Sequence, residues 1–591
     1  MIRAQRVRLT KSGSRRRPAV SKSRSRSAVM PDRRGGQWRV LAGLMAVATA
    51  GGLAMVAQPA LAAALCVGGG SGCYPTIQAA VNAAHDGDTI TIGPGTFAGG
   101  VTITKSVYLL GAGPTATIIR GGGSVLTIGA FGASSEPVVS ISGVTITGGV
   151  ARSSPESIPF TGKAGVWAAG GGIEIPPGAH LAVGATVTIS NSVITGNHAD
   201  PRSTIPAGFS CPGHFPKGQC PFAPAWGGGI DSWGILTLTH TAVTDNSVGA
   251  APGLPGVASD ADGGGIYSRQ GSLTLTSTVV AGNHATAIIP DGRFAEGAAI
   301  FAGYSGFGPA GGTNTLAFED SDIAGNSALL SSDFPRFFGG KFQDPTANSG
   351  GIVAGPGVSS TTVQNTLVAN NSAIATDLNG EPSAIDAAMN VSNGSLTMTN
   401  TVISGNRAIT NSSTSADVGP AGSALEVDGG GTISNTQITG NYAAMVSPHG
   451  AAAVNGALGL FGNTSLLTVR DSTISGNTAT ATSTTGSVSI QGAGVFNDGL
   501  LTLIGDSVTS NSGTATGPSG EAQGGGIWNG TTFTGPPVEL ALQHTAVTRN
   551  SLTGSHGVKL QGGGLFTAPP ATVILTDSVI ALNIPDQCVG C

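Results

Sequence analysis

The chain has 591 residues, of which 95 are glycine, 10% are charged and 5% are aromatic. An average protein carries about 25% charged residues; here Ser, Thr and Asn are expected to cover the surface instead, which is typical of a strand-rich solenoid with little helix. The net charge of −4 becomes −16 without residues 1–62. So acidic a chain argues against a nucleic-acid partner.

Residues 1–62 have the pattern of a targeting segment. Thirteen basic residues lie between positions 3 and 39, the apolar run Val40–Ala57 follows, and Ala60, Leu61 and Ala62 form an Ala-x-Ala motif. The pattern predicts a signal peptide cleaved after Ala62, and a mature chain that is extracellular or on the cell surface with no transmembrane domain. Because the apolar run slightly exceeds the usual length, an uncleaved membrane anchor is the alternative.

Six cysteines form three pairs that are close in sequence. Their even number, the predicted export and the short separations favour disulfides. The predicted pairs are Cys66 with Cys73, Cys211 with Cys220, and Cys588 with Cys591. For the last pair, whose spacing is CxxC, a redox or zinc motif is the alternative.

A short helix and the first strands are predicted in residues 63–113. Pro75 suits the first turn of a helix, and an apolar face follows at helical spacing, made of Ile77, Ala80, Val81 and Ala84. This helix is expected to cover the open end of the strands that come next. Those strands are predicted at Thr89–Ile92, Val101–Ile103 and Val107–Leu110.

From residue 114 to 583 the chain is built of repeats. The clearest copy is GSLTLTSTVVAGNHA (Gly271–Ala285), preceded by GGGIYS (Gly263–Ser268). Ile266, Leu273, Leu275 and Val280 are apolar and alternate with polar residues, which predicts short strands with one buried face. Glycines before the first strand and Gly282-Asn283 after the last supply the turns.

Two polar columns recur at fixed spacing, separated by 33 to 49 residues from one copy to the next. The closing column consists of Asn197, Asn246, Asn283, Asn326, Asn371, Asn406, Asn441, Asn477, Asn511, Asn550 and Asn583. Six residues earlier stand Asn191, His240, Ser277, Asp320, Asn365, Asn400, Asn435, Asp471, His544 and Asp577, with Asp506 displaced by one. These residues are expected to be bend residues stacked in ladders, and not catalytic groups.

This periodicity predicts an all-β fold, a single-stranded right-handed parallel β-helix with a short N-terminal capping helix. Each coil is expected to contain three short strands, with loops of variable length at one corner. The repeat coils are expected over residues 114–583, followed by a tail at 584–591.

The stretch Thr76–Gly113 resembles the opening of pectin-lyase-like right-handed β-helix proteins, and Cys73–Phe97 is similar to the CSLREA segment of bacterial surface proteins. The later GGGI and VxGN units resemble the repeats of chlamydial polymorphic outer-membrane proteins. The resemblance covers residues 73–583 and implies the fold. It leaves the function open, because such folds include lyases, hydrolases, esterases and non-catalytic adhesins, and the NTD, DD, GHG and RIK motifs of polygalacturonase-like enzymes are missing here.

If the isoleucine of GGGI points inward, the next residue points outward. In two consecutive coils that residue is Glu174 and Asp231, whose strands are expected about 4.8 Å apart. Carboxyl groups about 5 Å apart are used by retaining glycosidases as acid and nucleophile. The two are therefore candidate catalytic residues. Nearby aromatic residues could form a sugar subsite, namely Trp167, Trp226, Trp233 and Tyr267. In the alternative, loops cover this face, bury the tryptophans and leave the acids solvated.

In the last coils the same outward position carries Phe496, Trp528 and Phe566. If this stripe is exposed, it could stack on a glycan or a partner surface. The alternative is that preceding loops cover it, or that it protects the C-terminal edge.

No cofactor and no metal-ligating residues are predicted. Asp260, Asp262 and the acids of the bend column leave calcium as a possible ion, although no calcium-binding nonapeptide occurs. The leading hypothesis is a secreted or surface-attached monomer, non-catalytic, that serves adhesion, envelope structure or glycan binding, with a polysaccharide or a host or envelope surface as partner. The alternative is a polysaccharide lyase or glycoside hydrolase.

Overall fold

The computed structural model describes residues 64–152, 156–157, 164–165, 167–200, 224–249, 259–288, 292–303, 314–332, 337–338, 341–342, 346–377, 383–392, 394–412, 422–448, 452–462, 464–531 and 538–591. The predicted signal peptide and the predicted pair Cys211 and Cys220 lie outside these residues. Within them, no helix has both the length and the apolar character needed to cross a membrane.

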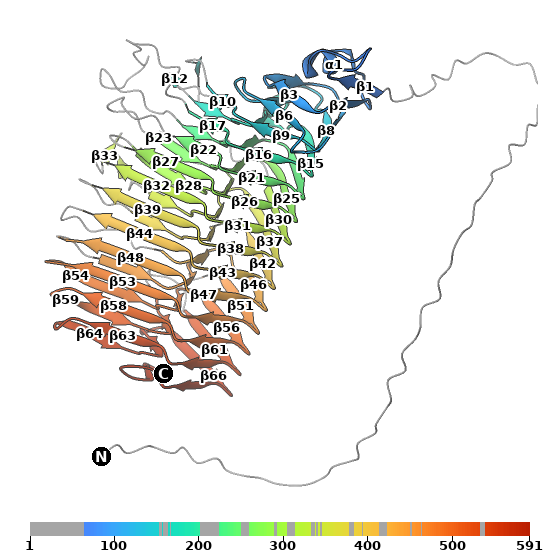
Figure 1. Cartoon of the computed structure of the whole chain (residues 1–591). Coiled ribbons are helices and arrows are strands. Elements are labelled where there is room, and N and C mark those ends of the chain that lie inside the picture. The colour runs from blue at the N-terminus through green and yellow to red at the C-terminus, as the bar shows by residue number, and fades with distance from the viewer. Residues whose placement is uncertain are drawn as a thin grey trace, which may run out of the picture. The chain divides into compact units, whose positions relative to one another are not determined.

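Three long parallel sheets run through the described coils (Figure 1). Sheet A has fifteen strands, from β1 (Ala64–Val67) to β66 (Thr572–Thr576). Sheet B has fourteen, from β3 (Gly95–Ala98) to β67 (Val579–Ala581). Successive coils add one strand to each sheet, always parallel to the last. The chain is a right-handed parallel β-helix.

Sheet C carries the residues discussed below as candidate sites. Its fourteen described strands are β4 (Val101–Ile103), β7 (Leu126–Ile128), β14 (Ile173–Ile175), β19 (Ile230–Ser232), β24 (Ile266–Ser268), β29 (Ile300–Ala302), β36 (Ile352–Ala354), β41 (Met389–Val391), β45 (Leu425–Val427), β50 (Leu458–Leu460), β55 (Val495–Asn497), β60 (Ile527–Asn529), β65 (Leu565–Thr567) and β68 (Cys588–Val589). Since β68 pairs with β65, the segment predicted as a tail is part of the last coil.

The coils have more strands than the three predicted. One coil runs through β23 (Ser259–Asp262), β24 of sheet C, β25 (Gly271–Thr276), β26 (Val279–Ala281) and β27 (His284–Ile288). The first and last of these belong to additional parallel sheets. Sheet D has eleven described strands from β10 (Val150–Ala151) to β63 (Ser551–Gly554). Facing it are sheet E, with six described strands from β13 (Ala168–Ala169) to β40 (Ser383–Ile385), and sheet F, with four from β49 (Ala452–Asn455) to β64 (Val558–Gln561).

Three apolar cores fill the inside of the described coils, and the third, between sheets D and F, includes Met445, Val488 and Ile490. The main core lies inside sheets A, B and C, and its members include Ile266, Leu273, Leu275 and Val280, all fully buried as predicted. A second core lies between sheets D and E and is lined almost entirely by alanine. Small side chains let these two sheets approach closely, so segments expected to be loops form strands instead.

The closing asparagine column forms a continuous hydrogen-bonded ladder inside the β-helix. Each side-chain amide from Asn197 to Asn550 donates to the Oδ1 of the next asparagine, as from Asn326 to Asn371 at 2.9 Å and from Asn371 to Asn406 at 3.0 Å. The same amide donates to a backbone carbonyl of the preceding coil, as from Asn371 to Ile323 at 2.9 Å. All eleven are buried, so the predicted ladder is confirmed. Their predicted role as bend residues was wrong, because the left-handed residue is the one before each asparagine, such as Gly282 with φ 64° and Asn370 with φ 55°.

The second polar column provides the left-handed bends that were predicted. Its non-glycine members have φ between 48° and 51°, from Asn191 to Asp577. The placement of Asp506 in this column was wrong, because Gly505 takes the bend with φ 71°. Asp506 instead belongs to a third column of buried Ser and Thr residues, whose hydroxyls accept a backbone N–H from the coil before. There Asp506 accepts from Ser472 N at 2.7 Å, and Thr545 accepts from Asp506 N at 3.3 Å.

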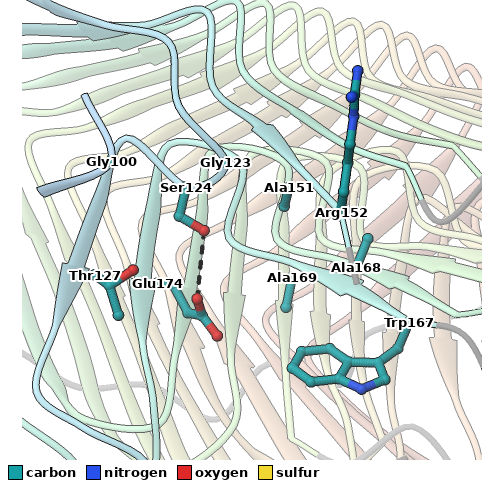
Figure 2. A pocket seen from close by; sticks show the side chains of 10 residues that line it. All are labelled: Gly100, Gly123, Ser124, Thr127, Ala151, Arg152, Trp167, Ala168, Ala169 and Glu174. Atoms are coloured by element: carbon teal, nitrogen blue, oxygen red, sulfur yellow. Dashed lines mark hydrogen bonds between the residues drawn. The ribbon is translucent and has the colours of Figure 1, made fainter. Parts of the chain in front are cut away.

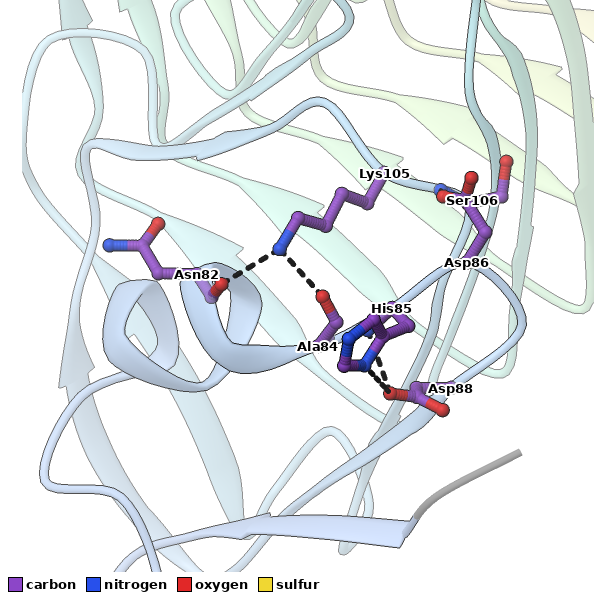
Figure 3. A network of polar contacts seen from close by, with 7 residues as sticks. All are labelled: Asn82, Ala84, His85, Asp86, Asp88, Lys105 and Ser106. Carbon is purple, nitrogen blue, oxygen red and sulfur yellow. Dashed lines mark hydrogen bonds and ion pairs between the residues drawn. The ribbon is translucent and has the colours of Figure 1, made fainter. Parts of the chain in front are cut away.

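The predicted capping helix is α1 (Ile77–Ala83), and its predicted apolar face is buried. Thr76 is the N-cap and accepts from Ala79 N at 3.1 Å, so Pro75 precedes the helix instead of opening it. Lys105 holds the other end, since its Nζ donates to the carbonyls of Asn82 and Ala84 at 2.7 and 2.6 Å (Figure 3).

The predicted strands that follow are β2 (Thr89–Ile92), β4 and β5 (Tyr108–Gly111); β2 and β4 match their predicted bounds, and β5 is one residue later. Cys66 and Cys73 form the predicted disulfide at this end, and Cys588 is bonded to Cys591 in the last coil.

We expect Asn371→Ala to destabilise the coils around it. Asn371 is fully buried, and its loss leaves the Asn326 N–H and the Ile323 carbonyl without their partner. Each unsatisfied group costs about 1–3 kcal/mol, so the free energy of unfolding should fall by about 2–4 kcal/mol in urea denaturation. The control is Asn365→Gly, an exposed bend with φ 49° that glycine adopts readily, and its midpoint should stay close to that of the wild type. Equal losses in both variants would contradict a special role for the ladder.

Asp506 should make stability depend on pH. Burial raises the pKa of its carboxyl to about 6, above the unfolded value of about 3.9. Between these values the unfolded chain loses the proton first, so stability should fall as pH rises from about 4 to about 6. Asp506→Thr restores the hydroxyl of neighbouring coils and should remove this loss, worth up to about 3 kcal/mol at pH 7. Thermal unfolding across this range tests it, with exposed Asp320→Asn as the control; a Thr variant that keeps the wild-type slope would refute the assignment.

Candidate functional site

The candidate site lies on the outer face of sheet C. Parallel pairing aligns Glu174 of β14 with Asp231 of β19, and Asp231 with Tyr267 of β24. Phe301 of β29 comes next. Since paired strands lie about 4.8 Å apart, these side chains form a column, and the predicted adjacency of Glu174 and Asp231 is confirmed.

Asp231 is held in a buried ion pair. Its Oδ1 lies 3.0 Å from Arg269 Nε, and the side chains are 4% and 7% exposed respectively. The guanidinium carbon of Arg269 lies 4.0 Å from the ring centroids of both Trp226 and Tyr267, and 5.1 Å from that of Trp233. Burial raises the pKa of Asp231, whereas the charge and hydrogen bond of Arg269 lower it. Asp231 is therefore a structural carboxylate in this conformation.

The predicted aromatic subsite is mostly an internal ladder. Ring centroids of Trp167 and Trp226 lie 6.1 Å apart, those of Trp226 and Tyr267 6.4 Å, and those of Tyr267 and Phe301 5.0 Å. Trp226, Trp233 and Tyr267 are buried, and Trp167 is partly exposed. The alternative prediction was right about the tryptophans at 226 and 233 and wrong about the acids, since Asp231 is buried with them.

Glu174 is the carboxylate that remains partly exposed. Ser124 Oγ donates to its Oε2 at 3.4 Å. Burial, followed by the neighbouring charge of Asp231, raises the pKa of Glu174 to about 7. At neutral pH this carboxyl is therefore present in both protonation states, which suits hydrogen bonding to hydroxyl groups or proton transfer.

Glu174 opens into a pocket of about 410 Å³. Figure 2 shows Ser124, Thr127 and Glu174 grouped together, with the indole of Trp167 on another side of the pocket. The lining residues are Gly100, Gly123, Ser124, Thr127, Ala151, Arg152, Trp167, Ala168, Ala169 and Glu174. A smaller cavity of about 30 Å³ is lined by Asp231 and Arg269 and also by Glu174 and Trp167. The larger pocket is lined by Glu174 but not by Asp231.

The C-terminal aromatic stripe is buried. Phe496 and Trp528 stack with centroids 4.8 Å apart and planes 4° apart, and Phe461 packs against Phe496 at 4.7 Å. Phe566 completes the cluster, and the three predicted residues are 1–8% exposed. The exposed stripe expected from the sequence is therefore absent, and the covered alternative describes these residues.

Comparisons with known proteins identify no family. Neither a protein-family model nor a curated protein matches the chain. Among solved structures, the A-module of mannuronan C-5 epimerase AlgE6 from Azotobacter vinelandii aligns over 84% of this chain and 94% of its own, with 13% identity and a TM-score of 0.24. A score this low supports no argument about function.

Arg269 and a second group of acids on the same face were not predicted from the sequence. Arg269 follows the outward Tyr267 by two residues, and only strand register places it beside Asp231. The second group includes Asn390 and Glu426, which occupy the outward position in β41 and β45. The GGGI motif is lost in these coils, and the distance from the outward position to the closing asparagine varies, from 15 residues at Glu426 to 25 at Phe301, so no fixed spacing marks the two positions.

Arg269→Met should destabilise the fold strongly. It leaves Asp231 buried without its partner, and breaking a buried pair costs about 3–5 kcal/mol. Adding Asp231→Asn should recover much of that loss, because the isolated charge is removed. Urea denaturation of the two single variants and the double variant measures the coupling; purely additive effects would contradict the pair's structural role.

Proposed function

We propose that this protein is exported, that it is secreted or held at the cell surface, and that it binds a glycan at the Glu174 pocket without cleaving it. Export rests on the pattern of residues 1–62. The surface assignment rests on the resemblance to CSLREA-type and chlamydial outer-membrane repeats, and the acidic mature chain favours a partner other than nucleic acid.

The proposal rests on the different environments of the two candidate carboxyl groups, Glu174 and Asp231. Glycosidases of both common mechanisms use two carboxyl groups that flank the scissile bond. Here Glu174 faces the pocket, whereas Asp231 is committed to Arg269 and is 3% exposed. A pocket with one carboxyl, one guanidinium, two hydroxyl side chains and one indole has the groups that hold a sugar, because sugars offer hydroxyls at their edges and apolar C–H faces.

The second candidate is a lyase or another enzyme that uses Glu174 alone. It is favoured by one observation, the pKa of about 7 at Glu174. A general base works best with a pKa near the operating pH.

The test is to incubate the chain from Ala63 with a panel of acidic and neutral polysaccharides, and to measure binding by affinity electrophoresis and cleavage by new reducing ends or unsaturated products. We expect binding without products. Glu174→Gln and Trp167→Ala should each weaken binding at least tenfold, and the exposed control Glu319→Gln should not. Products that vanish in Glu174→Gln would establish the enzyme instead. Binding that neither variant changes would place the site elsewhere.

A further inference from the structure

A second group of acids lies on the outer face of sheet C, away from the Glu174 pocket. Asn390 of β41 is the register partner of Glu426 in β45. Its Nδ2 donates to Asp386 Oδ2 at 2.7 Å and contacts Glu426 Oε1 at 3.3 Å. Asp428 follows β45 directly. Asp386 and Asn390 are 0% and 4% exposed, and Glu426 and Asp428 are half-buried, so the group has one side toward solvent.

Within the part of the chain that the structure describes, no basic side chain balances the charges of this group. No described residue forms an ion pair with Asp386, Glu426 or Asp428, in contrast to Asp231 with its arginine. Burying carboxylates without a positive partner is costly, so the arrangement calls for a positively charged ligand.

Neutral oxygens near the acids also lack partners. Asn390 Oδ1 is buried and accepts no hydrogen bond, although the other atom of the same amide bridges two carboxylates. Ser423 Oγ is likewise unpaired, and this residue is 1% exposed. That hydroxyl lies over the outer face beside Glu426, since a methyl group added at Gly459, the register partner of Glu426, would come within 2.6 Å of it. Both oxygens can accept a hydrogen bond or bind a cation; the Ser423 hydroxyl lies beside Glu426, and Asn390 Oδ1 belongs to the amide whose Nδ2 contacts both carboxyl groups.

The donor set is made of oxygen alone. Within the described residues, no three acidic, histidine or cysteine side chains already surround one point as a ready metal set. The set offered here is mixed: two carboxylates, one amide carbonyl and one hydroxyl. Calcium accepts six to eight such oxygens, water included, in flexible geometry, whereas magnesium demands a near-octahedral site and transition metals favour nitrogen or sulfur.

We propose that Asp386, Asn390, Ser423 and Glu426 form a calcium-binding site on the outer face of sheet C, with Asp428 adding negative charge at its solvent side. Bound calcium joins two successive coils and neutralises their carboxylates. The calcium considered from the sequence was placed at Asp260, Asp262 or the acids of the bend column, so this location is new. It does not depend on the glycan proposal.

The experiment is calcium titration of the chain from Ala63 by calorimetry, with thermal unfolding in parallel. We expect one site with a Kd of about 10⁻⁴–10⁻³ M, the range of extracellular calcium modules. The unfolding midpoint should rise with calcium, because a ligand that binds only the folded state stabilises it. The double variant Asp386→Asn, Glu426→Gln keeps the shapes and removes the charges, so it should fold and show at least a tenfold weaker Kd and no midpoint shift.

The matched control is Asp320→Asn with Asp322→Asn, two exposed acids in another sheet, which should respond to calcium as the wild type does. If the double variant at the site fails to fold, Ser423→Ala tests the same claim through a neutral ligand and should weaken the Kd. An absent calcium response, an equal response in the double variant, or an equal response to magnesium would each overturn the calcium site.

Discussion

The structure depends on the hydrogen-bonded asparagine ladder. A primary amide has both donor and acceptor groups, so each asparagine can bind the coil before it and the coil after it at once. The ladder runs from Asn197 to Asn583 inside the β-helix, where water cannot replace a lost bond. A coil shifted by one residue would break its link and turn its apolar side chains outward. Register is therefore common to all coils, and the columns on the outer faces follow from it.

The sequence predicted what depends on strict repetition. The asparagine column, the alternating leucines and the helix at Ile77–Ala83 all match the structure, because local propensity and tertiary packing agree there. Sheets D, E and F could not be predicted in the same way. Strands such as His284–Ile288 present alanine and threonine instead of large apolar residues, and alanine is a poor strand former in isolation. Their stability comes from neighbouring coils and from the narrow core between facing sheets.

The outer face of sheet C was predicted in position but not in environment. Register made Glu174 and Asp231 neighbours, as expected from the repeat. Burial, however, depends on what surrounds the column, and strand alternation does not carry that information. The ion pair with Arg269 keeps Asp231 buried and away from the pocket. Arg269 follows β24, and no sequence motif connects it to β19. The burial of Phe496 and Trp528 could not be predicted for the same reason, because strand alternation does not show what covers the outer face.

Along the outer face of sheet C, the buried side chains at the outward positions are stabilised in different ways. In the last coils aromatic rings stack on one another, which needs no polar partner. At Asp231 an arginine supplies the opposite charge and is itself held between aromatic rings. Two places follow neither solution: Glu174 opens into a pocket, and the acids around Asn390 have no basic partner among the described residues. The ladder satisfies the buried asparagines by repetition, but other buried oxygens in the described coils, such as those of Asn348 and Ser349, also lack a partner. At Asn390 the unpaired oxygens lie together with carboxyl groups that have no basic partner, and this coincidence indicates a ligand more strongly than an unpaired oxygen alone.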